Sequence, residues 1–291
     1  MISPAILRKI RKIHIHANHV VNDVFAGEYE SAFRGRGMQF EEVREYLPGD
    51  DVRDIDWNVT ARFGHPYVKV YREERELTIM LLVDVSSSSL FGTREQFKQE
   101  LAAEIASVLA FAATKNNDRV GLVIFSDRIE KCIPPKKGTN HVWRLIREVL
   151  SHRTLSVRTD IPAALTYLNR IMRRRATVFL VSDFIARDYE KALRISARKH
   201  DVIALSITDP RETELPDAGM VELRDAETGE TMLVDTSSEA VRSAYRAQAE
   251  AMRRERLNLL RSSGVDCIEV HTDRPYIDPI MQFFRMREKR Q

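Results

Sequence analysis

The sequence has 291 residues, 43% of them hydrophobic, which is enough to bury a sizeable core in one large domain or in a medium-sized domain with an appendage. Its 46 basic and 43 acidic residues leave a formal net charge of only +3, so no global field for binding nucleic acid is expected. The two cysteines, Cys132 and Cys267, are far apart and have no Cys or His at ligand spacing, which argues against a disulfide framework and a zinc site.

The sequence predicts neither a targeting signal nor a membrane-spanning segment. No stretch reaches the roughly 18 apolar residues of a membrane helix, and the N-terminus lacks the apolar run and cleavage site of a signal peptide. We therefore expect a cytoplasmic protein. A helix is predicted from about Ser3 to Phe25, with an isoleucine-rich face opposite a basic face. That face could touch a membrane surface, but docking onto the domain or onto a partner is the interpretation that we favour.

The stretch that follows, residues 26–75, is rich in charged residues, Gly and Pro. This texture predicts short β pieces, especially from Tyr67 to Tyr71, and no amphipathic helix of useful length. We therefore expect residues 1–75 to form an N-terminal helix and a β-rich extension, and residues 76–291 to form the main domain.

From residue 76 onward, predicted strands and helices alternate. The strands are predicted at Thr78 to Ser86, Arg119 to Phe125, Thr177 to Ser182, Asp201 to Ile207 and Asp266 to His271, with Ile129 to Ile133 as a candidate neighbour of the second. The helices are predicted at Thr93 to Lys115, Asn140 to His152, Asp160 to Arg174, Tyr189 to Lys199, Ser238 to Ser262 and Asp278 to Arg287. A β-hairpin near residues 219–236 interrupts the alternation. The pattern predicts an α/β fold with a doubly wound, mainly parallel sheet.

Oxygen-bearing side chains follow two of these strands. The first strand ends in Asp84, with Ser86 and Ser88 at alternating positions, and a later strand ends in Ser182 and Asp183. Thr159, just before a predicted helix, is placed to face the same sheet edge. Because the carboxyl ends of parallel strands share one edge, these oxygens can converge.

Hydroxyl and carboxylate oxygens without His or Cys suit a hard cation, Mg²⁺ first, with Mn²⁺ or Ca²⁺ possible. Neutral hydroxyl ligands would leave the cation electron-poor, so it should attract a carboxylate from outside the chain. The alternative is that Asp84 only forms a strand-end turn and that the serines cap the following helix. The matching positions of Thr159 and Asp183 favour the metal site.

The pattern D-x-S-x-S, followed by a Thr and then an Asp, resembles the metal-ion-dependent adhesion site of von Willebrand factor A domains. The resemblance covers about Thr78 to Asp273 and implies a fold of that type, with a metal held directly by hydroxyls and completed by an acidic residue of a partner. It implies five site residues, namely Asp84, Ser86, Ser88, Thr159 and Asp183.

The segment before the first strand, GRGMQFEEVREYLPGDDVRDIDWNVTARF, resembles the signature of the bacterial family called domain of unknown function 58. The matching residues are Gly37, Phe40, Arg44, Tyr46, Gly49, Asp50, Arg53, Ile55, Asp56, Trp57, Ala61, Arg62 and Glu74. Members of that family are often linked with MoxR-type AAA+ ATPases, so the resemblance implies such a partner and a role in protein assembly or maturation.

The acidic run in this segment also has a reading of its own. Its four Asp residues could form a nuclease-like cluster, but an ion-pair network is favoured, because Arg44, Arg53 and Arg62 are near enough in sequence to neutralise them. Trp57 would then anchor the segment in the core.

These observations favour a non-enzymatic interaction module that binds an acidic partner residue through a metal ion. The main rival is a Mg²⁺-dependent phosphohydrolase with Asp84 as nucleophile or ligand, although the second Asp of such enzymes is replaced here by Ser86. A membrane-surface scaffold that uses the first helix is a third, weaker alternative. No Walker A loop or dinucleotide-binding glycine motif is present in the sequence.

Overall fold

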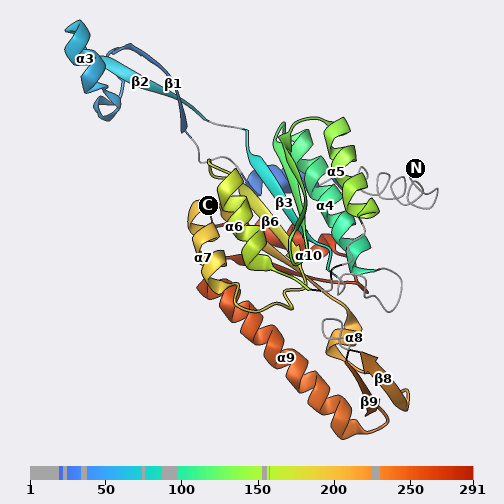
Figure 1. The fold of residues 1–291 in the computed structure, drawn as a ribbon. Helices are drawn as coiled ribbons and strands as arrows, with labels where there is room; N and C mark the ends of the chain where they lie inside the picture. The colour runs from blue at the N-terminus through green and yellow to red at the C-terminus, as the bar shows by residue number, and fades with distance from the viewer. Residues whose placement is uncertain are drawn as a thin grey trace. The chain divides into compact units, whose positions relative to one another are not determined.

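The computed structural model describes residues 20–21, 25–33, 38–73, 76–86, 97–152, 156, 158–224 and 230–290. The main sheet in these residues has six strands (Figure 1), which in sheet order are β10 (Asp266–His271), β7 (Asp201–Thr208), β6 (Thr177–Ser182), β3 (Thr78–Asp84), β4 (Arg119–Phe125) and β5 (Ile129–Lys136). Neighbouring strands run parallel except β5, which pairs with β4 in the antiparallel direction. The predicted α/β fold with a doubly wound, mainly parallel sheet is therefore confirmed.

Helices cover both faces of the sheet (Figure 1). One set comprises α2 (Ala26–Ala32), α4 (Lys98–Lys115), α5 (Thr139–Ser151) and α10 (Ile277–Glu288), and the other comprises α6 (Ile161–Ile171), α7 (Glu190–Lys199) and α9 (Glu239–Ser262). Short α8 (Pro210–Thr213) follows β7, and the predicted hairpin is present as β8 (Met220–Arg224) and β9 (Thr231–Asp235). The strands form where apolar runs are buried on both sides of the sheet, as in the whole of β6.

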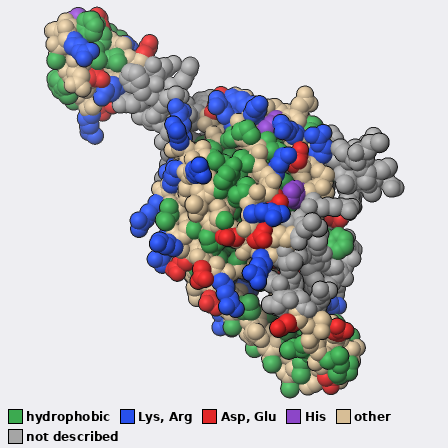
Figure 2. Space-filling model, viewed as in Figure 1, with side chains coloured by type: hydrophobic (Ala, Val, Ile, Leu, Met, Phe, Trp, Pro, Cys, Tyr) green, Lys and Arg blue, Asp and Glu red, His purple; other side chains and the backbone are tan. Residues whose placement is uncertain are grey.

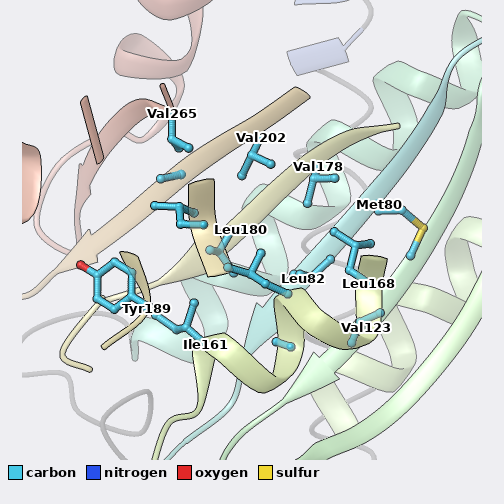
Figure 3. Packing of buried hydrophobic residues seen from close by; sticks show 14 of the residues in the cluster. Met80, Leu82, Val123, Ile161, Leu168, Val178, Leu180, Tyr189, Val202 and Val265 are labelled. Carbon is cyan, nitrogen blue, oxygen red and sulfur yellow. The ribbon is translucent and has the colours of Figure 1, made fainter. Parts of the chain in front are cut away.

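The core beneath α6 and α7 consists of apolar side chains from the sheet and from these helices (Figure 3). Leu82 of β3, Leu180 of β6 and Leu168 of α6 are fully buried in it. The core therefore fixes β3 and β6 next to each other, and with them the two strand ends that carry the predicted site.

A smaller compact unit, residues Phe33–Leu77, is distinct from the unit that contains the sheet. It consists of an antiparallel ribbon, β1 (Met38–Glu45) and β2 (Tyr67–Glu73), with a 3₁₀ turn at Val52–Asp54 and the short helix α3 (Trp57–Phe63). The described residues up to Ala32 group with the unit that contains the sheet. There, Tyr29 of α2 donates a hydrogen bond to the buried carboxylate of Asp118 at 2.9 Å.

The prediction that Trp57 anchors this segment in a core was wrong, because 69% of the Trp57 surface is exposed. A two-stranded ribbon and one short helix provide no second layer that could enclose an indole ring. Hydrophobic side chains are visible on the surface of this unit in Figure 2, and Phe63 of α3 is also exposed.

Two sequence predictions fall wholly or largely outside the described residues, and two short helices were not predicted. The predicted helix from Ser3 to Phe25 lies largely outside the described residues, as does Ser88. Helices α2 and α3 were not predicted, since each has only seven residues. Among the residues that the structure describes, we find no helix with both the length and the apolar character needed to cross a membrane.

Candidate functional site

The strand register places the two predicted strand ends beside each other. Val83 of β3 pairs with Val181 of β6, so the next and last residues of these strands, Asp84 and Ser182, lie side by side at the sheet edge. Successive connections run from β3 to β4 on one side, while β6 lies on the other side of β3. The carboxyl edge between β3 and β6 is thus a topological switch point, where open α/β sheets bind ligands.

Asp84 is the centre of a hydroxyl cluster at this edge. The Ser182 hydroxyl donates to Asp84 Oδ2 at 2.7 Å, and the Thr159 hydroxyl donates to the same oxygen at 3.3 Å. The backbone N–H of Ser86 donates to Asp84 Oδ1 at 3.0 Å, and Ser86 itself is fully buried. The structure therefore brings together Asp84, Ser86 and Thr159 as the sequence predicted, with Ser182 in contact with the same carboxylate.

Burial and, to a lesser extent, the nearby carboxylate of Asp183 raise the pKa of Asp84 to about 6. Hydrogen bonds from Ser86 and Ser182 act in the opposite direction, because they stabilise the ionised carboxylate. Asp84 is only 4% exposed. Asp84 is therefore a buried carboxylate beside a second carboxylate, and a positive charge placed next to it would stabilise its ionised form.

The Asp183 carboxylate is oriented by the chain that leaves β6. Its Oδ1 accepts the Ile185 N–H at 3.1 Å, while the Phe184 N–H donates to the Ser182 hydroxyl at 3.0 Å. Phe184 adopts a left-handed backbone with φ of 58°, and its ring is buried. Such a conformation is costly for a bulky residue and is found where the surrounding structure imposes it, frequently at functional sites.

Two residues that the sequence analysis did not select complete the site. Lys98, in the first turn of α4, donates from Nζ to Asp183 Oδ2 at 3.1 Å and also pairs with Glu212 of α8. The Lys98 side chain is 3% exposed. Glu212 could have been found, because it follows the end of β7 and so lies at the same sheet edge; Lys98 gave no signal, since buried lysines are rare.

Burial and the neighbouring charges act in opposite directions on the pKa values of Lys98 and Glu212. Burial acts to lower the pKa of Lys98, but the carboxylates of Asp183 and Glu212 outweigh burial and raise it. Burial raises the pKa of Glu212, although the Lys98 ammonium opposes this effect. The ammonium therefore supplies the positive charge that Asp183 and Glu212 need.

A cavity of about 10 Å³ lies beside Asp84 and Asp183. Its volume is enough for about one water molecule or a bare ion. Its lining includes Asp84, Lys98 and Asp183. A larger hollow of about 680 Å³ between α7 and α9 contains none of the predicted site residues. The small cavity, and not the large hollow, is therefore the candidate site.

The donor set fits a hard cation, since it consists of two carboxylates and several hydroxyls. Within the described ranges, no three His, Cys, Asp or Glu side chains are grouped so as to hold a metal ion. A cation here would thus depend on the hydroxyls of Ser86 and Thr159 as well as on Asp84. Asp183 already accepts a hydrogen bond from the Lys98 ammonium.

The predicted network in the smaller unit is present in part. Arg44 and Asp50 form two parallel hydrogen bonds of 2.7 Å, and this pairing lowers the pKa of Asp50 to about 2. Arg53 approaches only Asp51, at 3.8 Å on the exposed surface, and Arg62 forms no ion pair with any residue that the structure describes. Asp56 instead caps α3 by accepting the N–H groups of its first turn, and lies 3.7 Å from Lys69.

The strand order and strand directions define a doubly wound α/β domain with a mainly parallel sheet. The chain belongs to the family described as "Protein of unknown function DUF58", which matches residues 42–255. It is 32% identical to "Uncharacterized protein Rv1480" of Mycobacterium tuberculosis (strain ATCC 25618 / H37Rv) over 98% of this chain and 91% of the relative.

Solved structures that are similar to this chain match it at low identity. Conserved hypothetical protein BatB from Bacteroides thetaiotaomicron is 16% identical, with a TM-score of 0.47 over 73% of this chain and 99% of that one. The SpRpn10 VWA domain is 10% identical, with a TM-score of 0.39 over 71% of this chain and 95% of that one.

Proposed function

We propose that this chain is a non-enzymatic protein-interaction module that holds a divalent cation, Mg²⁺ first, at the β3–β6 edge and binds an acidic side chain of a partner protein there. The observation that carries the proposal is the convergence of the Thr159 and Ser182 hydroxyls on Asp84 Oδ2. When bound, the cation would supply positive charge to a partner carboxylate.

The hydrogen bonds explain how this chain would hold such an ion. Ser182 and Thr159 use their O–H protons on Asp84, so their oxygen lone pairs stay available. Ser86 and Thr159 are the hydroxyl candidates for direct contact with the cation, and Asp84 is the carboxylate candidate. Ser182 would act mainly by positioning Asp84, because it also accepts the Phe184 N–H.

Family membership, and not any contact in the structure, supports a MoxR-type AAA+ ATPase as the partner. We propose that the contact serves assembly or maturation of other proteins. An acidic residue on the ATPase or on its client is the feature that the site would recognise, since an electron-poor cation attracts carboxylates.

The test is capture of the purified MoxR-type ATPase by the immobilised full chain in the presence of Mg²⁺. We expect capture to be lost with a chelator and with Asp84→Ala, while circular dichroism and thermal unfolding show that the variant is folded. Asp217→Ala is the matched control, because Asp217 is an exposed carboxylate that pairs with Arg242 and does not line the small cavity. Capture that survives both chelation and Asp84→Ala would refute the proposal.

The phosphohydrolase alternative is separated by a second assay on the same samples. Hydrolysis of p-nitrophenyl phosphate is measured with Mg²⁺ for the unmodified chain and for Asp84→Ala. Turnover that needs both Asp84 and Mg²⁺ would replace the interaction proposal by an enzymatic one.

A further inference from the structure

The Lys98 ammonium is enclosed by carboxylates at the very edge where a cation is proposed to bind. It pairs with Asp183 and with Glu212, and its side chain is 3% exposed. The small cavity beside it is also lined by Asp84. Lys98 therefore differs from a lysine on a helix surface, because its ammonium is surrounded by two carboxylates instead of water.

Glu212 is held in place by its own backbone contacts. It belongs to the capping box of α8, in which Oε2 accepts the Asp209 N–H at 2.9 Å. Its other oxygen, Oε1, is left to face the Lys98 ammonium. Glu212 is therefore a fixed anchor on one side of Lys98, and Asp183 is the partner on the other side.

The formal charges of the four described side chains that line the cavity or pair with Lys98 do not sum to zero. Asp84, Asp183 and Glu212 contribute three negative charges when ionised, and Lys98 contributes one positive charge. The excess of two negative charges equals the charge of one divalent cation. Because Asp183 lines the small cavity together with Asp84, a divalent cation held there would lie beside the same Asp183 carboxylate that pairs with the ammonium.

We propose that Lys98 is a built-in competitor of the divalent cation, an ammonium that occupies one side of Asp183 and thereby sets how tightly the edge binds a metal. Glu212 is the positioning residue of this competition, since it draws the ammonium away from Asp183. The proposal rests on the proposed function in that it concerns the same cation, but its test needs no partner protein.

The experiment is calorimetric titration of the full chain with Mn²⁺ and with Mg²⁺, without a partner. For Lys98→Met we expect binding to be tighter by about tenfold or more, because a close like charge is removed. For Glu212→Gln we expect weaker binding, because the ammonium then turns to Asp183 alone. Opposite shifts from two neighbouring residues would not arise from a general loss of structure.

A double variant keeps the test valid if either single variant fails to fold. Lys98→Met combined with Glu212→Gln removes one charge of each sign, so the formal charge of the site is unchanged, yet Asp183 is released. We expect tighter binding than in the unmodified chain. Lys131→Met and Glu148→Gln are the controls, because this pair is 3.9 Å apart on the surface and should leave the affinity unchanged.

The outcomes separate the two proposals. Metal binding by the unmodified chain with equal affinity in the double variant and in both single variants would overturn the competitor role but leave the proposed function standing. Binding only after Lys98 is replaced would support the competitor role in its strongest form and overturn the proposed function. Binding in no variant would overturn both.

Discussion

Lys98 Nζ lies 3.1 Å from Asp183 Oδ2, whereas Asp84 in the same site receives its hydrogen bonds from hydroxyls and a backbone N–H. Two carboxylates at one sheet edge are therefore stabilised in different ways. Asp183 is half of a buried ion pair, and Asp84 is a buried negative charge whose only described hydrogen-bond donors are neutral. Stability measurements can distinguish these two situations without any knowledge of the partner.

Asp84→Asn should stabilise the metal-free protein, by about 1 kcal/mol, because it removes a desolvated charge beside a second carboxylate. Asp183→Asn should destabilise it by about 1–3 kcal/mol, because the Lys98 ammonium keeps only Glu212. Chemical denaturation of both variants in chelator checks the signs. If both variants shift stability in the same direction, the different roles assigned to the two carboxylates are incorrect.

The Asp84→Asn variant, compared with the unmodified chain, also tests the metal through linkage. A cation that binds the folded chain alone raises the unfolding free energy of the unmodified protein with increasing concentration. We expect Mg²⁺ to stabilise the unmodified chain and to leave Asp84→Asn unchanged, because that variant has lost the central carboxylate. An equal Mg²⁺ effect on both would place the cation elsewhere on the molecule.

The sheet and the part of the site formed by Asp84 and Ser182 could be predicted, because both follow from local sequence patterns. Apolar runs mark β3 and β6, and parallel strands present their carboxyl ends on one edge, which brings Ser182 to Asp84. The predicted alternation of helices and strands was therefore sufficient to predict the fold. The position of this part of the site is therefore set by the strand topology and not by detailed side-chain packing.

The part of the site formed by Lys98, Asp183 and Glu212 depends on contacts between distant residues, which no local sequence pattern specifies. Lys98 is far in sequence from Asp183 and Glu212, and a lysine in the first turn of a helix is disfavoured by the helix dipole. Its burial follows from the two carboxylates that meet it in the folded chain. Trp57 failed in the opposite way, since an indole normally indicates burial, but the small unit has no layer to cover it.

Gly121 should not tolerate a side chain, because β4 passes close to its neighbours there. An added Cβ would lie 2.6 Å from Met80 Sδ and 3.1 Å from both the Ile133 carbonyl oxygen and Pro135 Cδ. We expect Gly121→Ala to cost about 1 kcal/mol in thermal or chemical unfolding, even after the gain from lower backbone entropy. Gly27→Ala is the control, since nothing lies within 4 Å of its added Cβ, and it should not destabilise.

The Arg44–Asp50 pair should control the loop at the end of β1. Asp50 Oδ2 accepts the Leu47 N–H at 2.8 Å and also a hydrogen bond from Arg44. Arg44→Lys replaces two parallel hydrogen bonds by a single point charge, so we expect faster hydrogen exchange at the Leu47 amide. Arg53→Lys is the control, because Arg53 is largely exposed and 3.8 Å from Asp51. Unchanged exchange at Leu47 in Arg44→Lys would show that the loop does not depend on this pair.

His200 should make the fold sensitive to mild acid. It is 1% exposed, and its Nδ1 accepts the Ala176 N–H at 3.3 Å, an arrangement that requires the neutral ring on that side. Burial, together with the positive charge of Lys199, lowers the pKa of His200 to about 4. The unfolded chain therefore binds a proton at a higher pH, near 6.5, than the folded chain does.

The sign of the pH effect follows from this difference. Between pH 6.5 and 4 the unfolded state binds more protons, so the stability that the neutral ring supports is complete above pH 6.5 and is lost as the pH falls towards 4. We expect a loss of about 2–3 kcal/mol from this group. His200→Asn keeps an acceptor for Ala176 but cannot bind the proton, so denaturation curves from pH 7 to 4 should show a flatter decline. His65→Asn, which removes an exposed histidine, is the control; an equal decline in the unmodified chain and in His200→Asn would exclude His200 as the source.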